Sequence, residues 1–168
     1  MIPMMQPMVG EIQQEAATTK RMLERVPGDK LSWKPHPKSM SLGQLALHIA
    51  NIPGGISRLA QVDDFDASTA NFDQAEAASV AELLTALDAS VKTAEEYLSG
   101  LSESGAMGNW RLRAGEKEIF TIPRVAMLRS IMLNHWYHHR GQLSVYLRLL
   151  DVPVPVIYGR SADENPFG

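Results

Sequence analysis

Residues Asn134-His135-Trp136-Tyr137-His138-His139-Arg140-Gly141-Gln142 contain three of the five histidines of this 168-residue chain. They lie in an apolar-periodic stretch from Pro123 to about Leu150, which predicts a long amphipathic helix. His135 and His139 are four residues apart, so on a helix their side chains lie on one face. Two imidazoles placed in this way can bind one metal ion, but they need a further ligand from elsewhere in the chain.

His48 is the histidine that we expect to complete the site. A helix is predicted to begin at Ser41, because Ser41-Leu42-Gly43-Gln44 fits a capping box. His48 falls within the apolar stripe of this helix, which is Leu42, Leu45, Ile49 and Ile52. Such an imidazole is either a buried neutral ring or a ligand that faces another helix. Pro53 removes a backbone hydrogen bond and clashes with the carbonyl of Ile49, so we expect a kink beside His48.

The other two histidines fit a ligand role less well. His138 points roughly 100° away from His139 around a helix and is interpreted as a surface or packing residue. His36 lies between two prolines and is interpreted as a surface loop residue. The zinc-protease pattern is excluded, because Trp136 stands where that motif requires glutamate directly after the first histidine.

His48, His135 and His139 would leave at least one coordination position for water or substrate, which is typical of catalytic rather than structural sites. Zinc, nickel, iron or another divalent ion would accept three nitrogen ligands. Arg140 has two interpretations, a contact with an anionic substrate group or a structural ion pair. Gln142 lies near the ligand face, and Tyr158 is a candidate hydrogen-bond donor to substrate.

Four amphipathic segments predict an all-α chain, a four-helix bundle that forms one domain over residues 1–168. The first helix is expected at about 6–25 and the third at about 80–101. Residues 63–78, which are acidic and weakly apolar, are predicted to form a loop. Residues 110–113 and 118–121 resemble two short strands of a small hairpin, or else an ordered loop, before the last helix.

The composition narrows the classes of function. The chain has no cysteine, so disulfides, a thiolate nucleophile and Cys-ligated zinc are excluded. The net charge is −3 and the basic residues are scattered, so we do not expect nucleic-acid binding. No apolar run is long enough to span a membrane, and the N-terminus does not resemble a signal peptide. Cytoplasmic location is therefore the default expectation.

Three stretches carry a resemblance to a known family. Residues 134–143, followed by Tyr146-Leu147-Arg148, resemble the last-helix motif of the DinB family of damage-inducible, metal-binding proteins. Leu45-Ala46-Leu47-His48-Ile49-Ala50 resembles its second-helix motif, and residues 155–164 are similar to family endings. The resemblance implies a four-helix bundle, usually a homodimer, with a three-histidine metal site at His48, His135 and His139. Characterised relatives include metal-dependent thiol transferases and isomerases that use low-molecular-weight thiols.

Three functions remain open from the sequence. The first is a metal-dependent transferase that activates a low-molecular-weight thiol toward a small-molecule substrate; the thiol would come from a cofactor, since the chain has no cysteine. The second is a metal-dependent hydrolase, which lacks an evident carboxylate base near the histidine pair. The third is a stress-responsive dimer that binds metal or ligand without turnover.

Overall fold

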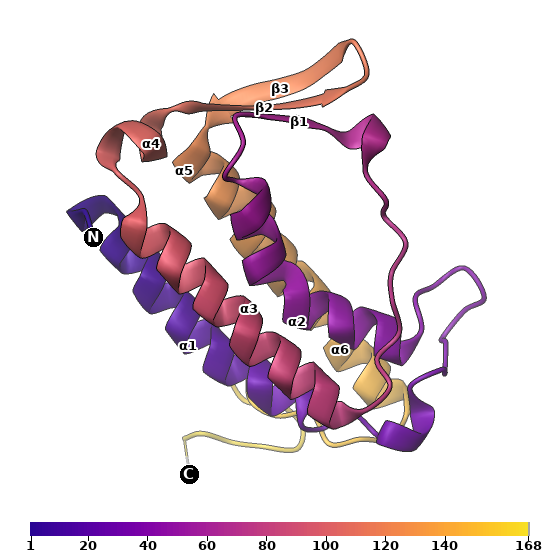
Figure 1. Cartoon of the computed structure of the whole chain (residues 1–168). Helices are drawn as coiled ribbons and strands as arrows, with labels where there is room; N and C mark the ends of the chain where they lie inside the picture. The colour runs from indigo at the N-terminus through magenta and orange to yellow at the C-terminus, as the bar shows by residue number, and fades with distance from the viewer. Residues whose placement is uncertain (168) are drawn as a thin grey trace.

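The computed structural model describes residues 1–167 and is mostly helical (Figure 1). The long helices are α1 (Gln6–Leu23), α2 (Leu42–Leu59), α3 (Val80–Gly100) and α6 (Asn134–Leu149). A short helix α5 (Arg124–Met127) and a π-helical segment η4 (Leu128–Leu133) lead directly into α6. The remaining helical pieces are the 3₁₀ turns η1 (Pro3–Met5), η2 (Gly28–Lys30) and η3 (Ala67–Thr69) and the short helix α4 (Glu103–Met107). Helix α3 packs against α1 and α2, and α6 packs against α2 and α1.

Helix α2 begins where the capping box predicted. The Ser41 hydroxyl accepts a hydrogen bond from the Gln44 backbone N–H at 3.1 Å, and the Gln44 side chain accepts one from the Ser41 N–H at 2.9 Å. These two bonds satisfy backbone donors that the first turn of a helix leaves free. Leu45 and Ile49 are fully buried, so the predicted stripe faces the core and the helix is fixed in rotation.

Pro53 lies inside α2, which continues past it to Leu59. The N–H of the next residue, Gly54, donates to the Ser90 hydroxyl of α3 at 2.8 Å. A Cβ atom on Gly54 would lie 2.9 Å from the Ser90 Cα and 2.9 Å from its carbonyl oxygen. The glycine therefore permits a close approach of α2 and α3, and α3 supplies an acceptor to the backbone beside the proline.

The last helical segment differs from the regular helix that the sequence predicted. It turns π-helical between Leu128 and Leu133, immediately before His135. A π-helical turn contains more residues than an α-helical turn, so an apolar stripe counted at 3.6 residues per turn loses register. Val145 and Leu149, two apolar residues of this segment, are 57% and 58% exposed. The core instead receives Trp136, Leu143 and Leu147 from α6.

A three-stranded sheet within residues 1–167 corrects the all-α expectation. Strands β2 (Asn109–Ala114) and β3 (Lys117–Pro123) form the predicted hairpin, which is confirmed. Strand β1 (Asp64–Asp66) pairs with β2 in parallel, so the stretch 63–78 is not wholly a loop. Arg113 of β2 binds Asp64 and Asp66 at 2.7 and 2.6 Å, which ties the two strands together. The sheet lies at one end of the helices (Figure 1).

Within residues 1–167, no helix combines the length and the apolar character needed to cross a membrane.

Candidate metal centre

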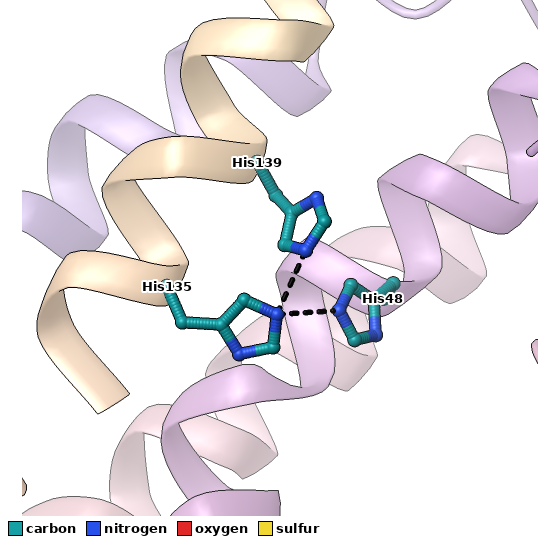
Figure 2. Close-up of side chains that lie close together, drawn as sticks. All are labelled: His48, His135 and His139. Atoms are coloured by element: carbon teal, nitrogen blue, oxygen red, sulfur yellow. Dashed lines mark hydrogen bonds between the residues drawn. The ribbon is translucent and has the colours of Figure 1, made fainter. Parts of the chain in front are cut away.

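The structure brings His48 of α2 together with His135 and His139 of α6 (Figure 2). The Nε2 atom of His135 lies 3.2 Å from Nε2 of His48 and 2.7 Å from Nε2 of His139. One nitrogen from each ring lies within 4.8 Å of the other two, and all three side chains are partly buried. Three nitrogen atoms from two helices therefore converge on one point, and we call these three residues the histidine triad.

The His139 ring also has a hydrogen-bond acceptor on the side away from this point. Nδ1 of His139 lies 2.7 Å from Oε1 of Gln142, and an amide oxygen can only accept. The backbone of Ile131 acts to raise the pKa of the His135 ring, and the side chain of Gln74 acts to raise that of the His48 ring, as polar groups that accept from a ring do.

The bond to Gln142 fixes the tautomer of His139, in which Nδ1 carries the proton. When the outer nitrogen of a neutral imidazole donates, its Nε2 carries a lone pair and no proton. With this tautomer in all three rings, three lone pairs face one another within 4.8 Å and no hydrogen atom lies between them. A cation at their centre would satisfy all three, and outer acceptors of this kind orient metal-binding histidines in general. The donor set therefore fits a divalent transition metal ion.

The electrostatic environment keeps the triad neutral, which is the form that binds metal. Burial, followed by the charge of the neighbouring histidines, lowers the pKa of His135 from 6.5 to about 4. Burial and then the charge of His139 lower the pKa of His48, and burial lowers the pKa of His139. All three rings are therefore free of the extra proton at neutral pH.

Gln74 is a site residue that the sequence analysis missed. It belongs to the segment between β1 and α3, which comes close to the N-terminal end of α2 before α3 begins (Figure 1). Its backbone carbonyl accepts a hydrogen bond from Gln44 at 3.0 Å, and its side-chain Nε2 donates to the Phe72 carbonyl at 2.9 Å. The Gln74 side chain is close enough to His48 to act on the pKa of its ring. Its position in a segment without periodicity gave no signal in the sequence.

The remaining predicted site residues lie in different surroundings. Gln142 contacts His139 directly, as described above. Arg140 is 1% exposed and forms an ion pair with Glu15 of α1, so of its two interpretations the structure shows the ion pair. The Tyr158 hydroxyl contacts both Arg140 and Glu15, in the same cluster and not in the triad. His138 and His36 are exposed, as the sequence predicted.

With the geometry established, comparison with known proteins identifies the family. The profile of the DinB family matches residues 1–165. The chain belongs to the DinB family. DinB membership and the three-histidine group together fit a metal-binding protein.

Solved structures of DinB-like proteins share the fold. One from Bacillus subtilis has a TM-score of 0.68 at 20% identity, covering 91% of this chain and 98% of its own. One from Bacillus cereus has a TM-score of 0.65 at 22% identity, covering 87% and 92%. A putative family member from Exiguobacterium sibiricum has a TM-score of 0.64 at 19% identity, covering 93% and 97%. At these identities the likeness concerns the fold alone. A search of curated proteins found no match.

Proposed function

We propose that this DinB-family protein is a metal-dependent transferase that activates a low-molecular-weight thiol toward an electrophilic small molecule. His48, His135 and His139 would hold a divalent ion, with zinc or nickel preferred and iron as an alternative. The observation that carries the proposal is the convergence of three ring nitrogens from α2 and α6, with Gln142 as an acceptor on the other side of the His139 ring. The four packed helical segments agree with the bundle expected for the family, and we extend the proposal to a homodimer.

A bound divalent ion would lower the pKa of a thiol so that the nucleophilic thiolate forms near neutral pH. The chain contains no cysteine, so the sulfur must come from a cofactor. The role of the protein residues is to hold the site. Gln142 orients the His139 ring, and burial keeps the rings unprotonated. In the transfer, the thiol loses its proton to water, the sulfur forms a bond to an electrophilic carbon, and the bond from that carbon to the leaving group breaks, so that the leaving group departs with the electron pair.

Hydrolysis is the weaker alternative. It needs a base to accept a proton from water, and in the described part of the chain no Asp or Glu joins the triad to form a larger ligand group. Binding of metal without turnover is the third possibility, and the experiments below distinguish the three.

Metal analysis of the purified protein is the first test. We expect one divalent ion per chain in the wild type and at least about 100-fold weaker binding in His48→Ala and His139→Ala, since two imidazoles cannot replace three. His138→Ala is the matched control, because it removes an exposed imidazole from the same helix. A wild-type protein that takes up no divalent metal, or a control that loses it, would contradict the proposed site.

Turnover is the second test. Metal-loaded protein is incubated with glutathione, cysteine or coenzyme A thiol and with a haloaromatic or bimane electrophile, and conjugate formation is followed by absorbance or fluorescence. We expect conjugation that requires both the metal and the triad. Stoichiometric metal without conjugation by any thiol would favour the non-enzymatic alternative, and cleavage of an ester panel without added thiol would favour hydrolysis.

A further inference from the structure

An apolar pocket opens beside the triad. Its volume is about 180 Å³, and its lining consists of His48, Asn51, Ile52, Gly55, Ile56 and His135. Two of these residues are triad members, so a molecule that reached the triad from this side would place its remaining atoms against α2. The larger hollows of the surface, between α1 and α3 and around the C-terminal tail, contain none of the triad residues.

Two adjacent glycines of α2 have different surroundings. At Gly54 a Cβ atom would collide with the Ser90 backbone, so helix packing requires glycine there. At Gly55 a Cβ atom would meet nothing within 4 Å, so packing makes no such demand. Glycine is unfavourable inside a helix because it loses the most backbone freedom on folding. Its presence at position 55 therefore has no explanation in packing or in helix stability.

The pocket provides an explanation. Gly55 lines the pocket together with two of the triad residues, and a Cβ atom at this position would meet only open space. We propose that Gly55 determines substrate specificity by keeping open a subsite for a short aliphatic group of a ligand whose polar end lies at the triad. The inference rests on the proposed function and deepens it by assigning the chemical class of the bound group.

The size and chemistry of the pocket indicate which chemical class of ligand group fits it. A volume of 180 Å³ equals that of about six water-sized groups at roughly 30 Å³ each, which suits a short chain of carbon atoms. Ile52 and Ile56 supply branched aliphatic walls, and Asn51 is an exposed polar side chain of the lining. A charged or strongly hydrated group would lose water there without a matching partner on these two isoleucines.

The test uses cobalt-loaded protein, because a thiolate that binds cobalt(II) produces a near-ultraviolet absorption band that reports affinity without turnover. The two probes are 1-butanethiol and 3-mercapto-1-propanol, which have equal chain lengths and differ by a terminal methyl or hydroxyl group. We expect wild-type protein to bind 1-butanethiol roughly fivefold more tightly than 3-mercapto-1-propanol. Burial of the terminal methyl group is favourable, whereas burial of the hydroxyl group costs its hydrogen bonds to water.

Gly55→Leu should fill the subsite and bring this ratio close to one, while cobalt still binds at one ion per chain. Gly55→Ala should give an intermediate ratio and guards against poor folding of the leucine variant. Gly10→Leu is the matched control, because Gly10 is an exposed glycine inside α1 with nothing within 4 Å of its would-be Cβ. It should keep the wild-type ratio.

The outcomes separate the two proposals. Wild-type protein that does not bind cobalt would overturn the proposed function and the subsite with it. Cobalt binding with equal affinity for the two thiols would overturn the subsite alone. A preference that survives in folded Gly55→Leu would also overturn it, because the preference would then arise elsewhere. Loss of the preference in Gly55→Leu but not in Gly10→Leu is the supporting result.

Discussion

The buried ion pair between Arg140 and Glu15 permits a prediction that separates a structural role from a substrate-binding role. The side chains are 1% and 8% exposed. Arg140 also donates to the Glu15 carbonyl at 3.2 Å and to the Thr19 hydroxyl at 3.1 Å, and thereby joins α6 to α1. Replacing Arg140 with methionine keeps most of the side-chain volume and removes the charge, which leaves the Glu15 carboxylate buried without its cation.

The expected cost follows from this geometry. Removing one partner of a buried ion pair typically lowers the free energy of unfolding by about 3–5 kcal/mol, because the remaining charge has lost both water and partner. The total stability of a natural protein is of the order of 5–15 kcal/mol, so Arg140→Met should lose a large part of it. The double variant Arg140→Met/Glu15→Leu removes both charges and should recover to within about 2 kcal/mol of the wild type.

Urea unfolding followed by circular dichroism measures these differences, provided that the free energy of unfolding depends on urea concentration with the same slope in every variant. Arg129→Met is the matched control, because Arg129 pairs with Glu11 of α1 at 2.8 Å but is 51% exposed and should contribute about 1 kcal/mol or less. A loss below about 1 kcal/mol in Arg140→Met would refute the reasoning. If the affinity for metal and thiol fell at least about tenfold in the stable double variant, Arg140 would have a role in ligand binding.

Three further predictions concern the site and its support. Gln142→Ala should weaken metal binding about 10- to 100-fold, because His139 loses its outer acceptor, whereas Gln142→Glu keeps an acceptor and should not weaken binding. Competition with a chromophoric chelator measures both affinities, and an equal loss in the two variants would contradict the acceptor role. Gly54→Ala should lower the free energy of unfolding by about 1–3 kcal/mol, because the new Cβ collides with the Ser90 backbone. Gly55→Ala should raise the free energy of unfolding by up to about 1 kcal/mol, because alanine favours the helix and meets no neighbour. If urea unfolding showed Gly54→Ala to be the more stable of the two variants, the packing described would be wrong. Protons compete with metal for the triad nitrogens, and the pKa of each ring is lowered, that of His135 from 6.5 to about 4. Metal affinity should therefore stay nearly constant down to a pH of about 6.5 and decrease below it. A tenfold decrease in affinity between about pH 7.5 and 6.5, measured by the same chelator competition, would argue against this.

The features that the sequence predicted correctly depend either on residues close together in the chain or on the periodicity of helical faces. The capping box of α2 involves positions three apart, and the hairpin strands are joined by a short turn. The triad was predictable because His135 and His139 share one helical face and His48 lies on the apolar face of another helix, so both faces had to turn inward. Periodicity therefore located the rings without any knowledge of the intervening connections.

The features that were missed depend on distant pairs. Strand β1 forms because Asp64 pairs with Arg111, 47 residues later in the chain. The strand has only three residues, which is too short for an alternating pattern that the sequence could reveal. Gln74 reaches His48 only because the backbone of its segment is held by α2. Arg140 was ambiguous because its partner Glu15 is 125 residues away along the chain. The π-helical turn has no sequence signature that a 3.6-residue period would reveal.

The triad also bears on how the fold is held together. His48 and His135 are separated by 87 residues and lie on helices that pack against each other. The chain has no cysteine with which to form a covalent cross-link. An ion held by these rings would close the long intervening loop much as a disulfide does, and a ligand that binds only the folded state raises stability with its own concentration. The melting temperature would thus report metal supply, so that the protein is most resistant to unfolding when its metal is abundant.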